Sequence, residues 1–166
     1  SSKHDAFFTG FVHKPYPPIY LELSRNAAFH SASVIRGTEG GIIPSLRQIG
    51  KVHYYDTPGE EDKMYEVKPE DLEINDESRA VDIPDDIVRK DTKDKIESKV
   101  SATDIAKATV KSGQEALSGR DGAMKSCIQL GASIILQRMT GNDILKCSKE
   151  VLKVIDSGSA LKRMKL

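Results

Sequence analysis

The spacing of apolar positions in the first part of the chain predicts a strand, a helix and a second strand. Residues 6–12 form a short apolar run typical of a buried strand. The prolines at positions 15, 17 and 18 oppose a helix, so we expect the helix to begin at Pro18 and to end near His30. Residues 32–36 return to a strand pattern. This order of elements is typical of an α/β domain.

A second pattern predicts a β-hairpin. Residues 51–55 are rich in β-branched and aromatic side chains, and residues 64–67 have a similar character. Residues 57–60 lie between them and contain Pro-Gly, which favours a turn. Residues 69–72 begin with proline and carry two acidic side chains, a pattern that favours the first turn of a short helix.

The last part of the chain is predicted to be helical, after a charged segment with no aromatic residue at 75–99. We interpret that segment as an exposed excursion or linker. The helical periodicity then predicts a helix over 104–117 capped by Ser101 or Thr103, the most apolar helix over 123–139, a helix capped by Asn142 and ended by Ser157-Gly158, and a short basic tail over 160–166.

These elements predict the fold class α/β. We expect part of a mixed sheet flanked by helices, with a β-hairpin and a three-helix C-terminal region. The chain divides into residues 1–74, which hold the strand–helix–strand unit and the hairpin, residues 75–99, the charged linker, and residues 100–166, a helical segment packing on the same domain.

Composition narrows the class of protein. With 166 residues and 30% charged side chains, the chain fits one globular domain or two small ones. No apolar run approaches the roughly 20 residues that span a bilayer, so no membrane association is expected. Cys127 and Cys147 have no metal-ligand spacing, which predicts reduced thiols, no metal ligands and an intracellular, reducing location, cytoplasmic or organellar. Ser1 in place of methionine suggests a processed, tagged or cut chain.

The formal net charge of zero hides an asymmetry. Residues 1–55 carry 6 basic and 3 acidic side chains, residues 56–98 carry 7 and 16, and residues 99–166 carry 12 and 6. A basic carboxyl end favours a polyanion or an acidic partner. The predicted nucleic-acid or partner surface consists of Lys146, Lys149 and Lys153, which share one helical face, and of Lys162, Arg163 and Lys165. No aromatic side chains accompany them, and a solvated helix face is the alternative.

The segment Ala32–Ser45 holds the candidate ligand site. A strand there runs into a loop with three glycines, and such loops bring backbone N–H groups close to anions. The predicted ligand- or phosphate-binding residues are Arg36, Gly37, Glu39, Gly40 and Gly41, together with His13 at the end of the preceding strand. The alternatives are a tight turn that needs glycine and a surface histidine. No catalytic residue is predicted.

Five short motifs occur in an order that resembles the carboxyl-terminal half of anthranilate phosphoribosyltransferases and of their paralogous, anthranilate-phosphoribosyltransferase-like branch. The motifs are Phe8-Thr-Gly-Phe-Val-His-Lys-Pro15, Ser33-Val-Ile-Arg-Gly-Thr-Glu-Gly-Gly41, Tyr65-Glu-Val-Lys-Pro-Glu-Asp-Leu72, the helix end at 108–122, and Val154-Ile-Asp-Ser-Gly-Ser-Ala-Leu161. The resemblance covers nearly the whole chain except residues 75–98.

The resemblance implies a piece of an α/β domain that forms a cleft for phosphoribosyl pyrophosphate with an amino-terminal half. That half carries the diphosphate loop and a Lys-His-Gly motif, neither of which occurs in this sequence. The Asp-Glu pair that holds magnesium in the family falls at Ile42 and Ile43 here, and isoleucine cannot bind a hard cation. Magnesium and phosphoribosyl pyrophosphate are thus expected only if a complete site is assembled.

Two functions follow from the resemblance. The first is the carboxyl-terminal part of a phosphoribosyltransferase-like protein, inactive alone, that transfers a phosphoribosyl group to an aromatic amine when an amino-terminal half, another chain or a second copy completes it. The alternative is a family member without catalysis that acts as a nucleic-acid-binding or protein-binding scaffold; members of the paralogous branch are reported to bind nucleic acid.

Overall fold

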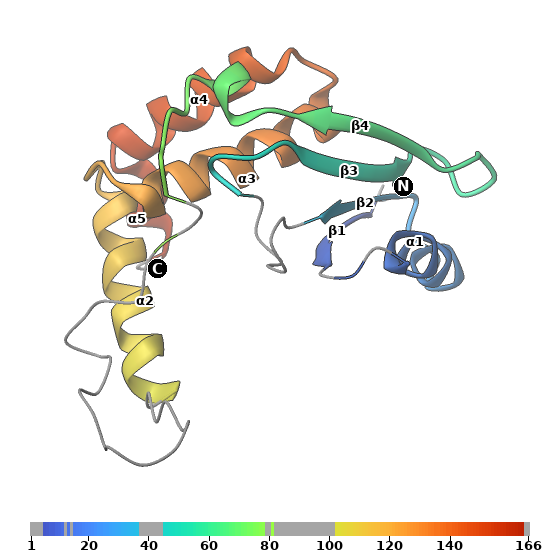
Figure 1. The fold of residues 1–166 in the computed structure, drawn as a ribbon, viewed down its shortest axis with the longest axis horizontal. Helices are drawn as coiled ribbons and strands as arrows, with labels where there is room; N and C mark the ends of the chain where they lie inside the picture. The colour runs from blue at the N-terminus through green and yellow to red at the C-terminus, as the bar shows by residue number, and fades with distance from the viewer. Residues whose placement is uncertain are drawn as a thin grey trace.

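The computed structural model describes residues 5–11, 13, 15–36, 45–78, 81 and 102–164. Within these residues the chain is an α/β structure with one four-stranded mixed sheet and five α-helices, which confirms the predicted fold class (Figure 1). The elements in chain order are β1 (Ala6–Phe11), α1 (Tyr16–Asn26), β2 (Ser31–Arg36), β3 (Gly50–Tyr55), β4 (Lys63–Val67), the 3-10 turn η2 (Pro69–Leu72), α2 (Ala102–Leu117), α3 (Ala123–Thr140), α4 (Ile144–Asp156) and α5 (Ser159–Met164).

The sheet follows the order of its strands along the chain, β1-β2-β3-β4. β1 and β2 pair in parallel, and they are joined by α1 because parallel neighbours need a crossover connection. β3 pairs antiparallel with β2, and β4 pairs antiparallel with β3 through the predicted hairpin. The carboxyl ends of β1 and β2 therefore lie side by side.

Each face of the sheet has its own apolar cluster, because successive side chains of a strand point to opposite faces. Ala32 and Val34 of β2 pack with Phe11, Leu21 and Tyr55 on the face covered by α1. Ile35, the next residue of β2, points to the other face and belongs to the larger cluster there, against α3. The buried members of this cluster are Ile35, Leu46, Val52, Val67, Leu72, Ile74, Cys127, Leu130 and Ile134.

Helix α1 begins and ends earlier than predicted. It starts at Tyr16, not at Pro18, so two prolines lie inside its first turn. This is tolerated because the first N–H groups of a helix have no intrahelical acceptor. It ends at Asn26, not near His30, where Ala27 caps it and Ala28 adopts a φ of 63°.

The three predicted C-terminal helices are present, with three differences. Asp143, not Asn142, caps α4: its carboxylate accepts the N–H groups of Leu145 (3.0 Å) and Lys146 (3.1 Å). The predicted basic tail contains a fourth helix, α5, which begins after Gly158 reverses the chain with a φ of 67°. Helix α2 starts at Ala102, two residues before the predicted position.

A buried polar network attaches the helices to the end of the hairpin. The Gln129 side-chain amide of α3 donates to Leu72 O (3.1 Å) and to Ser148 Oγ (2.8 Å) of α4, and Ser148 Oγ donates to the same carbonyl (3.1 Å). Val81 packs against the larger apolar cluster. The rest of the predicted linker beyond Ser78 lies outside the described residues.

An arginine from α1 holds the hairpin tip on one face of the sheet. The Arg25 guanidinium carbon lies 4.2 Å from the ring centre of Tyr55. Arg25 also donates to Pro58 O (2.8 Å) and forms an ion pair with Asp62 (2.6 Å).

A second arginine, from α3, holds the same tip on the opposite face. The Arg138 guanidinium carbon lies 3.8 Å from the ring centre of Tyr54. Arg138 donates to Ser33 Oγ (3.1 Å) and pairs with Asp56, which also accepts from Lys63 (3.2 Å). The two stacks clamp the start of the turn between α1 and α3.

Candidate functional site

The candidate site lies where the parallel strands β1 and β2 end. Their register places Phe11 opposite Arg36, the last residue of each strand. Ligands of α/β sheets commonly bind beyond the carboxyl ends of parallel strands. The fold therefore brings Arg36 to the edge at which the sequence predicted an anion site.

Arg36 is a half-buried arginine without a counter-charge among the described residues. Its Nε atom is buried, and no hydrogen-bond partner for it exists among the described residues. No ion pair to Arg36 is found in the described part of the chain either. A guanidinium without a hydrogen-bond acceptor or an ion pair nearby can donate its N–H groups to a bound anion.

Lys51 and His53 lie beside Arg36 on the same sheet face. Lys51 is directly opposite Arg36 on β3, and His53 lies two residues along the same strand. Lys51 Nζ is 3.4 Å from Glu66 Oε1, with both side chains nearly half exposed. The sequence analysis missed Lys51 and His53, although the alternation of strand residues 51, 53 and 55 assigns them to one face.

The charge of this cluster is reflected in His53. Burial lowers the pKa of the His53 imidazole from 6.5, Lys51 and Arg36 lower it further, and Asp62 acts weakly in the opposite direction. The ring also meets Phe11 edge-on, with centroids 5.9 Å apart. The lowered pKa favours the neutral imidazole in the absence of a bound anion.

His13 lies at the same end of the sheet but belongs to the connection into α1. Its ring is edge-on to Tyr16, with centroids 5.5 Å apart, and its carbonyl accepts the Tyr16 N–H (3.2 Å). The side chain is exposed. Within the described residues no contact joins His13 to Arg36, so its ligand role stays a prediction.

Several predicted site residues lie outside the described residues. These are Gly37, Glu39, Gly40 and Gly41 of the loop, the two isoleucines at 42 and 43, and Lys165. Their roles stay predictions.

The predicted basic surface is spread over α4 and α5. Lys146, Lys149 and Lys153 are all exposed on α4, and Lys162 and Arg163 are exposed on α5. Lys149 Nζ lies 3.6 Å from Glu73 Oε1. Because both side chains are exposed, this ion pair contributes little to the stability of the fold. Figure 1 shows α4 and α5 on the side of the molecule away from α1.

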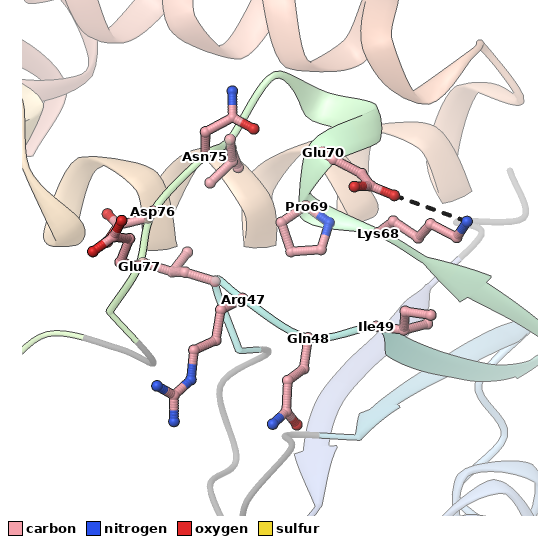
Figure 2. Close-up of a pocket in the computed structure, with 11 residues that line it drawn as sticks. Arg47, Gln48, Ile49, Lys68, Pro69, Glu70, Asn75, Asp76 and Glu77 are labelled. Carbon is pink, nitrogen blue, oxygen red and sulfur yellow. Dashed lines mark ion pairs between the residues drawn. The ribbon is translucent and has the colours of Figure 1, made fainter.

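A hollow of about 460 Å³ lies between the segment leading into β3 and the segment around η2 (Figure 2). Arg47 and Gln48 border it on one side, and Lys68, Glu70 and Asp76 border it on the other. Lys68 Nζ is 3.9 Å from Glu70 Oε1. Because its walls carry charges of both signs, the hollow selects no ligand charge.

The described residues do not fit a divalent cation. No group of three or more His, Cys, Asp or Glu side chains is close enough among them to hold a metal ion. The candidate site offers the nitrogen atoms of Arg36, Lys51 and His53, whereas Mg²⁺ requires oxygen ligands. Cys127 and Cys147 are buried free thiols, and burial raises the pKa of Cys127. Among the described helices none is long and apolar enough to cross a membrane.

Comparisons with known proteins identify solved structures with a similar fold. No protein-family model matches the chain, and no curated protein sequence matches it. Solved structures do: anthranilate phosphoribosyltransferase from Saccharomyces cerevisiae in complex with 4-fluoroanthranilate matches with a TM-score of 0.69 at 15% identity, over 97% of this chain and 41% of that chain. The Ser121Ala variant of that yeast enzyme with Mg bound matches with a TM-score of 0.68 at 14% identity, over the same shares.

The chain therefore spans about two fifths of the length of the solved structures that it matches. At this identity the match establishes the fold. The chain resembles the C-terminal part of anthranilate phosphoribosyltransferase.

Proposed function

We propose that the chain is the C-terminal part of a phosphoribosyltransferase-like protein. It would complete a site for transfer from phosphoribosyl pyrophosphate to an aromatic amine together with an N-terminal part. The observation that carries the proposal is the match over 97% of this chain but only 41% of a structure that holds a fluoroanthranilate. The missing share would come from a preceding segment, another chain or a second copy.

The chain alone would not catalyse the transfer. Its described residues at the ends of β1 and β2 offer cations for binding but no acid–base pair. Magnesium is present in the variant structure, but no group of three or more suitable side chains lies close together among the described residues of this chain. The role left to this chain is to form one wall of the cleft and to bind anionic ligand groups.

The test is an assay of the native protein isolated with whatever chain accompanies it. We expect loss of anthranilate fluorescence that depends on phosphoribosyl pyrophosphate and Mg²⁺, and no loss with the 166-residue chain alone. Mass spectrometry of the active fraction should show a Lys-His-Gly segment. A native product of 166 residues, without partner and without transfer, would exclude the enzyme function.

A scaffold function is the second candidate, favoured by the exposed cations of α4 and α5. Here the basic surface binds the phosphate backbone of a nucleic acid. The double variant Lys146→Gln/Lys153→Gln should weaken binding in a gel-shift titration and flatten its salt dependence. The matched control is Lys107→Gln/Lys111→Gln, which removes two exposed charges from α2. Equal loss in both variants, or no binding at low salt, would reject a dedicated surface.

A further inference from the structure

We propose that Arg36, Lys51 and His53 form a binding site for the phosphate group, or another tetrahedral oxyanion, of a small ligand. The site goes beyond the proposed function, because all three residues belong to this chain and need no second part. It can therefore be tested on the 166-residue chain even if no transferase activity exists.

Strand register brings the three side chains together. Arg36 ends β2, Lys51 is its direct partner on β3, and His53 follows on the same face. Phe11 flanks Arg36 from β1, and Met64 flanks His53 from β4. Two cationic side chains and one imidazole thus face one side of the sheet between two apolar neighbours.

The protein itself leaves this charge largely uncompensated. Like charges directly opposite each other destabilise a sheet, and Arg36 and Lys51 form such a pair. The buried Nε of Arg36 has no acceptor among the described residues. Glu66 reaches Lys51 only, across 3.4 Å and in contact with solvent. An anion between the two cations would remove the repulsion and supply the missing acceptor.

The donor set favours a phosphate group. The arginine fork binds two oxygens of one anion, and the lysine adds a compact charge from the adjacent strand, about 5 Å away. The site is open to solvent at Lys51, whose side chain is 42% exposed. Met64, which is exposed, can contact an uncharged part of the same ligand.

The imidazole of His53 provides a readout inside the site. Besides Lys51, Arg36 and Asp62, no other charged group shifts its pKa noticeably in the described chain. A bound anion favours the imidazolium, so it should raise the pKa of His53. His30, which precedes the opposite end of β2, serves as the internal reference.

The experiment is an NMR titration of the histidine ring signals of the 166-residue chain. Inorganic phosphate at fixed pH gives a dissociation constant, and sulfate, which stays a dianion across the histidine range, gives the change in the His53 pKa. We expect saturable shifts at His53 but not at His30. The Arg36→Gln variant should weaken phosphate binding at least roughly tenfold, since a hydrogen bond to a charged group is lost, and Lys51→Gln should weaken it less.

The control is Lys111→Gln on α2, which removes one exposed charge elsewhere and should leave the dissociation constant unchanged. Equal shifts at all histidines, wild-type affinity in Arg36→Gln, or equal weakening in Lys111→Gln would overturn the site. If Arg36→Gln loses its circular dichroism spectrum, Lys51→Gln and the sulfate effect on His53 decide. A short oligonucleotide can be titrated in the same way. If it shifts the His53 signals at a lower concentration of phosphate groups than inorganic phosphate does, the site binds nucleic acid and the small ligand is rejected.

Discussion

The two ends of the sheet treat their cations in opposite ways. At the hairpin end Arg25 pairs with Asp62, and Arg138 pairs with Asp56, each over a tyrosine ring. At the other end, among the described residues, Arg36 meets no carboxylate. The same residue type is therefore paired at one end of the sheet and, among the described residues, without an ion pair at the other.

The difference teaches how to separate structural charges from functional ones. A guanidinium that is stacked, paired and hydrogen-bonded has used most of its binding capacity within the protein. A half-buried guanidinium next to a lysine lowers the stability of the fold, because like charges repel each other. Such unfavourable arrangements are typical of ligand-binding sites. Substitution of Arg138 should therefore mainly lower the stability of the fold, whereas substitution of Arg36 should mainly weaken anion binding.

The largest effect is expected at the hairpin end. The Arg138→Gln variant should lower the free energy of unfolding by about 2 kcal/mol, because it loses the stack on Tyr54 and charged hydrogen bonds to Asp56. Urea denaturation measures this change. Arg120→Gln, which breaks the exposed pair with Glu115, is the control and should change stability by at most about 0.5 kcal/mol. Equal changes would mean that the clamp does not stabilise the fold.

A smaller effect is expected from the pH dependence of the unpaired end. The pKa of His53 is below 6.5 in the folded protein, so the unfolded chain binds more protons between the folded value and 6.5. Stability from this group is complete above 6.5 and is lost as the pH falls through the folded pKa. Urea denaturation at about pH 7.5 and about pH 5.5 should show a larger difference for the wild type than for His53→Gln. Added sulfate should reduce the difference.

The paired end should respond to acid at lower pH. Burial alone would raise the pKa of Asp56, but its hydrogen bonds to Arg138 and Lys63 hold the pKa below 3.8. This contribution is complete above 3.8 and is lost as the pH falls through the folded value. The effect is small because the carboxylate is half exposed. An acid titration followed by circular dichroism should show a shallower loss in Asp56→Asn; identical curves would contradict the pairing.

The smallest effect on stability is expected for Arg36→Gln. Removing this charge relieves the repulsion with Lys51 and breaks no ion pair among the described residues, so stability should change by no more than about 0.5 kcal/mol. Thermal unfolding in phosphate-free buffer measures it. A loss as large as that of Arg138→Gln would show that Arg36 is structural.

Local pattern was enough to predict most elements. The apolar run at residues 6–12, the β-rich residues 51–55 and the helical spacing over 123–139 each reappear as β1, β3 and α3. The errors lie at boundaries. Three prolines obscured the start of α1, since proline is unfavourable within a helix but tolerated in its first turn.

The candidate site was predicted only in part. Arg36 was found because it follows an apolar strand and precedes glycines. Lys51 and His53 were not, because their nearness to Arg36 depends on which strands pair and in which register. The contact between Arg138 and Asp56 at the hairpin tip could not be predicted from the sequence either, since the two residues are 82 positions apart.

The sequence by itself determined the strand–helix–strand unit, the hairpin, the helical C-terminal region and the arginine at the end of β2, because apolar periodicity and turn residues act over short distances. Only the tertiary structure decided which charges are paired and which are left open. Pairing depends on strand register and on helices packed against opposite sheet faces, and these bring together residues that no local pattern connects.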